Sequence, residues 1–104
     1  MNSNFYIKLD PETDKENDKK IISKVRSGDT KALDEIMNKY KSFVYTRVKP
    51  FFIVGAEKGD IIQEGMIGLF KAVKCYDLEK DVSFKAFADL CIRRQIITAI
   101  KTST

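Results

Sequence analysis

The side chains best suited to bind a partner lie near the end of the chain, between residues 84 and 101. At helical spacing, one side of this segment is apolar and is interrupted by a single polar residue, Gln95. The other side, which we call the basic face, combines cations with aliphatic groups: Leu90, Arg93, Arg94, Ile97, Thr98 and Lys101. Guanidinium and ammonium groups bind phosphates, and arginine also pairs with guanine edges. A helix of this kind fits the major groove of DNA, although the same face could equally cover another protein domain.

A second candidate surface lies between residues 57 and 75. When this segment is projected at about 100° per residue, one side is apolar and faces a core. The opposite side, which we call the outward cluster, mixes polar and apolar residues: Asp60, Gln63, Glu64, Met66, Ile67 and Phe70. Methionine and aromatic side chains inside a polar rim are typical of a protein interface. The alternative is a solvated face with one stray isoleucine, since single exposed apolar residues are common.

The residue types needed for catalysis or metal binding are scarce. The chain has no histidine, which is the most frequent general base and metal ligand. The two cysteines, Cys75 and Cys91, are 16 positions apart and form no paired-cysteine motif, so we expect neither a zinc site nor a disulfide framework. The sequence contains no phosphate-binding loop, dinucleotide-binding or zinc-protease motif. We therefore expect a protein that is not an enzyme and that holds no cofactor or metal.

Four helices are needed to position the two surfaces. The helical spacing of apolar residues predicts them at about 18–27, 30–49, 57–75 and 83–102, after a loose and flexible N-terminal arm at 1–17. Gly28 suits the end of the first helix, and Ser83 suits the start of the fourth. No segment alternates with the period of a strand. We therefore predict an all-α fold, a compact bundle of four helices.

Length, composition and charge narrow the class of protein further. With 104 residues, of which 43% are hydrophobic, the chain forms one domain with a modest core. No apolar run approaches the roughly 20 residues of a membrane span, and the N-terminus lacks the apolar stretch of a secretory signal. We therefore expect a cytoplasmic protein without membrane contact. The net charge is +4, and residues 84–104 carry four basic side chains against one acidic. This end suits a polyanion, although cations also stabilise a helix C-terminus.

Two stretches of the sequence resemble a known family. Residues 60–69 read DIIQEGMIGL and are followed by KAV at 71–73. Residues 83–88 read SFKAFA, and residues 92–100 read IRRQIITAI. In this order they resemble conserved region 2 of bacterial RNA polymerase sigma factors of the sigma-70 family. The particular residues of these stretches are similar to those of the sigma-H type, which is linked to stationary-phase and sporulation programmes. The resemblance covers residues 18–104.

The resemblance implies one partner for each surface. Region 2 of the family binds the coiled coil of the β′ subunit of core RNA polymerase, and the outward cluster holds the corresponding positions. Region 2 also recognises and melts the −10 element of promoter DNA during transcription initiation. Arg94 and Ile97 correspond to positions that read the upstream edge of that element, with Arg93, Thr98 and Lys101 in or beside the major groove.

The resemblance also implies a site for unpaired DNA at the start of the last helix. Phe84, Phe87 and Leu90 correspond to positions that handle the unpaired strand of the −10 element. Both phenylalanines project inward at helical spacing, so they also fit a plain core role.

The sequence departs from the housekeeping members of the family. Leu90 and Cys91 stand where those proteins carry paired tryptophans, and Val82 stands where they carry an aromatic residue. An aromatic ring stacked on a base contributes about 1–3 kcal/mol, so we expect weaker promoter melting and a stringent promoter preference. The second DNA-binding domain of the family, which reads the −35 element, has no counterpart in the sequence, so we expect a fragment of a longer factor.

A different class of function fits the same residues. A helical protein-interaction module could bind an acidic partner through its basic last helix, and an acidic anti-sigma factor would be one such partner. Dependence of binding on DNA sequence would separate the two interpretations.

Overall fold

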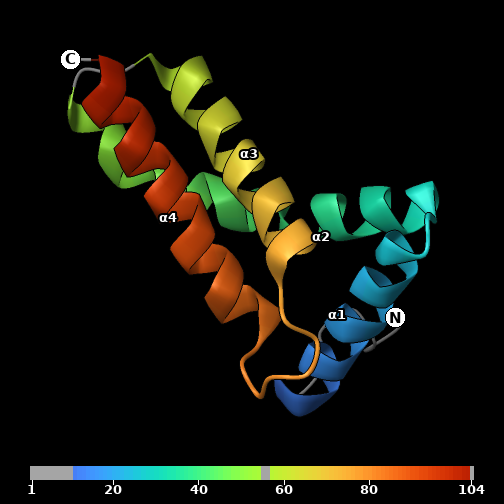
Figure 1. The fold of residues 1–104 in the computed structure, drawn as a ribbon. Coiled ribbons are helices and arrows are strands. Elements are labelled where there is room, and N and C mark those ends of the chain that lie inside the picture. Colours follow the sequence, from blue (N-terminus) through green and yellow to red (C-terminus); the bar gives the residue numbers. More distant parts are fainter. Residues whose placement is uncertain (1–10, 55–56, 104) are drawn as a thin grey trace, which may run out of the picture.

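The structure is a computed structural model that describes residues 11–54 and 57–103. Its elements are α1 (Pro11–Arg26), α2 (Thr30–Val48), the 3-10 helix η2 (Lys49–Val54), α3 (Lys58–Cys75) and α4 (Phe84–Ser103). Helices α3 and α4 pack along each other as an antiparallel pair, α2 crosses behind them, and α1 lies at the end where α3 meets α4 (Figure 1). The described residues form no strand. The predicted all-α fold with four helices is therefore confirmed.

The first helix begins earlier than the sequence predicted. We expected residues 11–17 in a loose arm, but α1 starts at Pro11, and residues 1–10 lie outside the part that the structure describes. Proline suits the first helical position because its missing N–H would have no partner there. Glu12 and Asp14 in the first turn complement the helix dipole. Asp14 also pairs with Lys39 of α2 at 2.6 Å, a tertiary contact that helical spacing does not reveal.

Local signals set the helix ends where the sequence placed them. Gly28 has φ of 99°, a left-handed conformation that favours glycine, and it separates α1 from α2. Asp29 caps α2, because its Oδ1 accepts hydrogen bonds from the backbone N–H groups of Lys31 and Ala32 at 3.0 and 3.1 Å. Ser83 caps α4 in the same way, through the N–H of Ala86 at 3.1 Å.

The core lies where one face of each helix meets the others. Its fully buried side chains include Ile22, Ile36, Val44, Val48, Leu69, Val73, Phe84, Ile92 and Ile96. Aromatic rings extend this core toward the start of α4. Phe84 meets Tyr40 and Tyr76 edge to face, with ring centroids 5.3 and 5.4 Å apart. The first turn of α4 is thereby fixed to both α2 and the end of α3.

A buried carboxylate joins α1 to α2. Asp18 is 1% exposed and accepts hydrogen bonds from the Tyr40 hydroxyl and from Lys39 Nζ, the latter at 2.6 Å. The buried charge is therefore paired and hydrogen-bonded, as a buried charge must be. Burial, and then the bond to Asp18, raise the pKa of the Tyr40 phenol well above its ordinary value of 10.0. The phenol stays neutral and remains a donor to Asp18.

Two glycines let α3 approach its neighbours closely. A Cβ added at Gly65 would lie 2.7 Å from Val44 Cγ1, so this glycine makes room for α2 side chains. A Cβ added at Gly68 would lie 2.7 Å from the Cα of Ile92 and 2.9 Å from the carbonyl oxygen of Cys91. At Gly68, α3 therefore touches the backbone of α4. The two helices that carry the candidate surfaces form one tightly joined pair.

Candidate functional site

The basic face is a free surface of α4. Leu90 and Ile97 are 39% and 42% exposed, and the four polar members Arg93, Arg94, Thr98 and Lys101 are exposed as well. The opposite side of α4 is sealed in the core by residues such as Ile92 and Ile96. The division into an inner and an outer face that the sequence predicted is therefore confirmed.

The two adjacent arginines of the basic face lie in different electrostatic surroundings. Arg93 Nε lies 3.3 Å from Asp89 Oδ1, and the same carboxylate oxygen accepts a 2.7 Å bond from Arg47 of α2. Arg94 forms no ion pair with any residue that the structure describes. Arg94 thus offers an uncompensated guanidinium, whereas the charge of Arg93 is partly balanced.

The structure separates the two phenylalanines that the sequence assigned to DNA. Phe84 is 0% exposed and packs between two tyrosines, which supports the core role that the sequence also allowed, and its contact with DNA stays a prediction. Phe87 is half-buried, with its ring centroid 5.8 Å from that of Tyr76. Part of the Phe87 side chain therefore remains accessible near the start of α4.

The outward cluster is also at the surface, although two of its members are only partly exposed. Asp60 and Gln63 are exposed, and Ile67 and Phe70 are 37% and 39% exposed. The remaining two members, Glu64 and Met66, are half-buried. Ile67 and Phe70, the apolar side chains on a largely polar side of the helix, are therefore accessible in the fold.

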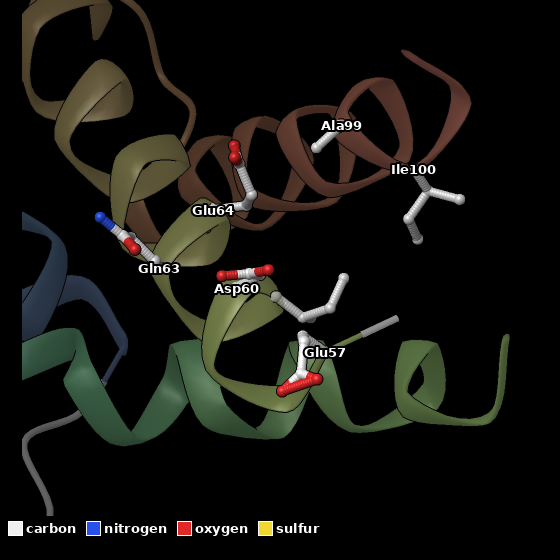
Figure 2. A pocket seen from close by; sticks show the side chains of 7 residues that line it. Glu57, Asp60, Gln63, Glu64, Ala99 and Ile100 are labelled. Atoms are coloured by element: carbon white, nitrogen blue, oxygen red, sulfur yellow. The ribbon is translucent and has the colours of Figure 1, made fainter. Parts of the chain in front are cut away.

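A pocket lies between the first turns of α3 and the last turns of α4 (Figure 2). Its volume is about 280 Å³, and it is lined by Glu57, Asp60, Ile61, Gln63, Glu64, Ala99 and Ile100. Figure 2 shows the Glu64 carboxylate on the side of α4, whereas the Gln63 amide points away from α4. Three carboxylates beside aliphatic groups suit a basic side chain, whose apolar stem and cationic head need both kinds of contact.

Gln95 connects α4 to α3. Its Nε2 donates to Glu64 Oε1 at 2.8 Å, and its Oε1 accepts from Lys71 Nζ at 2.8 Å. The polar interruption of the apolar side of α4 thus has a structural role, because it bridges α4 to α3. One oxygen of Glu64 is already engaged before any partner binds.

Sequence reasoning missed one cluster, which lies beside the start of α4. The Phe43 ring has the guanidinium of Arg47 4.6 Å and the ammonium of Lys85 5.4 Å from its centroid. Two pockets, of about 350 and 250 Å³, are each lined by Phe43 and Lys85. An aromatic ring with cations beside it is a surface on which an unpaired base can stack. Spacing gave no signal, because Phe43 fits the apolar side of its own helix and Lys85 lies 42 positions away.

The described residues contain no group of three His, Cys, Asp or Glu side chains that could hold a metal ion. Partial burial raises the pKa of the Cys91 thiol, which keeps it protonated and unreactive at neutral pH. Within the same residues, no helix has the length and apolar character of a membrane span.

The chain is similar to proteins of one family. Residues 36–104 match the family model described as Sigma-70 region 2. The chain is 53% identical over 87 residues to the RNA polymerase sigma-H factor of Bacillus subtilis, covering 84% of this chain and 40% of that protein. It is 39% identical over 70 residues to the RNA polymerase sigma-F factor of Bacillus licheniformis, covering 67% and 28%. With the RNA polymerase sigma factor SigA of Clostridium acetobutylicum it shares 31% identity over 80 residues, covering 77% and 21%. The chain spans 40% or less of the length of these curated relatives.

Proposed function

Because the chain belongs to the sigma-70 family, we propose that it is the part of a sigma factor that binds core RNA polymerase and directs recognition and melting of the −10 promoter element. The observation that carries the proposal is the exposure of Gln63 and Arg94, one residue from each motif of the family, on neighbouring helices. Had both side chains been sealed in the core, neither surface could meet a macromolecule.

For polymerase binding, the proposal assigns the outward cluster to the coiled coil of the β′ subunit. The pocket beside Asp60 and Glu64 suits an arginine or lysine from that coiled coil, while Ile67 and Phe70 supply exposed apolar area. Aromatic and aliphatic anchors inside a polar rim are the usual source of binding energy at such an interface.

For DNA binding, the proposal assigns the basic face to the edge of the promoter duplex. Arg94, Thr98 and Lys101 contact phosphates and base edges, so binding weakens as salt rises. The Phe43–Lys85 cluster and the accessible part of Phe87 receive unpaired bases, because bases stack on aromatic rings and nearby cations attract the phosphates of a single strand.

The missing aromatic residues limit how strongly the domain opens DNA by itself. Unstacking a base costs a few kcal/mol, which the protein must return through its own contacts. Leu90 and Val82 are exposed aliphatic residues and offer less stacking than aromatic rings. We therefore expect measurable affinity for a promoter fork only when core polymerase is also bound, together with low tolerance for imperfect promoters.

The test uses the chain together with core RNA polymerase and a fork-junction promoter. Arg94→Ala should weaken binding to the fork about tenfold and relax sequence preference at one position, because a bidentate base contact contributes about 1–3 kcal/mol. Lys20→Ala, which removes one exposed charge from α1, serves as the matched control. Unchanged promoter preference in Arg94→Ala would refute the assignment of the basic face to DNA.

Polymerase binding has its own test. Gln63→Ala should weaken binding to the β′ coiled coil about fivefold, in the range expected for loss of one hydrogen bond. Asn38→Ala, an exposed amide on α2, is the control and should bind normally. Equal affinity of Gln63→Ala and the unsubstituted chain would remove the outward cluster from the interface.

A second candidate function is favoured by the exposure of Leu90 and Ile97, which place apolar area among the cations of α4. Such a face also fits an acidic protein, of which an anti-sigma factor is one kind. Binding that ignores DNA sequence but responds to an acidic protein partner would support this second function.

A further inference from the structure

Helix α1 lies against the loop that joins α3 to α4, residues 76–83 (Figure 1). Basic side chains of α1 bond to this loop at two points. Lys19 Nζ donates to the carbonyl oxygen of Lys80 at 2.9 Å, and Lys15 forms an ion pair with Asp81. These cations of α1 are thus used inside the molecule, where they restrain the loop.

A third basic residue fixes the direction in which the chain leaves α3. The Nη2 of Arg26 donates to the carbonyl oxygens of Val73 and Lys74 at 3.1 and 3.2 Å, and it also donates to that of Tyr76. The last carbonyls of a helix have no partner within the helix, and a cation there complements the dipole. One guanidinium therefore ties the end of α3 and the first residue of the loop to α1.

The far end of the loop is held from the side of the core. The Tyr76 hydroxyl donates to the carbonyl oxygen of Val82, and the Tyr76 ring contacts Phe84 and Phe87. The loop is therefore anchored at one side by Tyr76 and at the other by α1. Removal of the α1 contacts would leave the middle of the loop, around Lys80, without that second anchor.

We propose that α1 is a positioning element for DNA opening, in which Lys19 and Arg26 hold the loop before α4 in a shape that, together with the start of α4, receives unpaired bases. This inference rests on the proposed function, which places unpaired DNA at the start of α4. A loop that is ordered before binding loses less conformational freedom when bases enter, so affinity for the opened strand is higher. Neither residue touches DNA or polymerase in this account; both act through the loop.

The experiment compares substitutions that remove equal charge from the same helix. Lys19→Ala is paired with Lys20→Ala, and Arg26→Ala is paired with Lys24→Ala, because Lys20 and Lys24 are exposed and make no side-chain bond to the loop. Each variant is measured for hydrogen exchange of the amides of residues 76–83, for binding of core polymerase, and for binding of a fork-junction promoter with polymerase present.

We expect Lys19→Ala to speed exchange of the loop amides about three- to tenfold, the range set by loss of one hydrogen bond. Arg26→Ala removes three hydrogen bonds and should speed this exchange at least as much. Their affinity for the fork should fall by a similar factor, while polymerase binding stays within twofold. Lys19→Arg keeps a donor at the same position and should restore both loop exchange and fork affinity. Lys20→Ala and Lys24→Ala should leave loop exchange unchanged.

Several results would overturn the role of α1. An equal loss of fork affinity in Lys19→Ala and Lys20→Ala would mean that only total charge matters. Normal fork binding by Lys19→Ala would also overturn it, and this half-buried position outside the core keeps the test valid even if Arg26→Ala fails to fold. If the unsubstituted chain with polymerase does not bind the fork, the proposed function itself is refuted.

Discussion

Replacement of Gly68 by alanine tests how closely α3 and α4 must pack. The added Cβ would lie 2.7 Å from the Cα of Ile92, 2.9 Å from the Cys91 carbonyl oxygen and 3.1 Å from the Cβ of Gln95. The first two atoms belong to the backbone of α4, so no side-chain rotation can relieve the contact. Helix α4 must move away from α3 as a whole.

The expected cost follows from two opposing terms. Overpacking of a well-packed contact costs about 1–3 kcal/mol, and the upper part of that range applies because the backbone is the obstacle. Alanine in place of glycine in a helix interior returns about 1 kcal/mol. We therefore expect Gly68→Ala to lower the free energy of unfolding by about 2 kcal/mol. For a domain of this size, that corresponds to a fall of roughly 8–16 °C in the unfolding midpoint.

The assay is thermal and urea unfolding followed by circular dichroism, with Gly59→Ala as the matched control. Gly59 also lies in α3, but a Cβ added there meets no atom within 4 Å. Gly59→Ala should therefore be neutral or slightly stabilising, by less than about 1 kcal/mol.

Gly68→Ala should also weaken a side-chain bridge between the two helices. A wider separation of α3 and α4 would stretch the bonds of Gln95 to Glu64 and Lys71. A Gly68→Ala protein as stable as the unsubstituted chain would refute the view that the helix pair is at its closest approach.

Three further outcomes follow from individual contacts. Asp29→Ala should lose about 1 kcal/mol of stability in urea unfolding, because it removes the cap of α2, whereas the exposed Asp34→Ala on the same helix should not. The raised pKa of the Tyr40 phenol, caused by burial and the bond to Asp18, stabilises the fold below pH 10, and that contribution should disappear as pH rises further. Denaturation at several alkaline pH values should therefore show a steeper decline for the unsubstituted chain than for Tyr40→Phe. Gln95→Ala should lower the free energy of unfolding by about 1 kcal/mol in the same assay. An unchanged free energy of unfolding would mean that competition from water cancels the contribution of the Gln95 bridge.

The helices were largely predictable because their signals are local. Gly28 and Ser83 mark helix ends through backbone conformation and capping, and these depend on neighbouring residues alone. The start of α1 was missed for the opposite reason. Asp14 and Asp18 look like a solvated acidic run in the sequence, whereas in the structure their contacts with Lys39 of α2 help to hold a folded helix there.

The candidate site divides in the same way. Helical spacing placed Arg94 and Gln63 at the surface, because one turn of helix fixes which residues share a side. Spacing could not decide the depth of Phe84, which depends on rings supplied by α2 and by the loop after α3. The Phe43–Lys85 cluster escaped notice because its members come from different helices and meet only in the packed structure.

By itself, the sequence determined that the chain forms four helices, which faces of the last two are turned outward, and which family it resembles. These properties depend on residue type and on spacing along the chain. The tertiary structure decided that α1 restrains the loop before α4, that Gly68 lets two backbones touch, and that Gln95 bridges α4 to α3. Each of these contacts joins residues distant in sequence, and packing against a common core is what brings them within bonding distance.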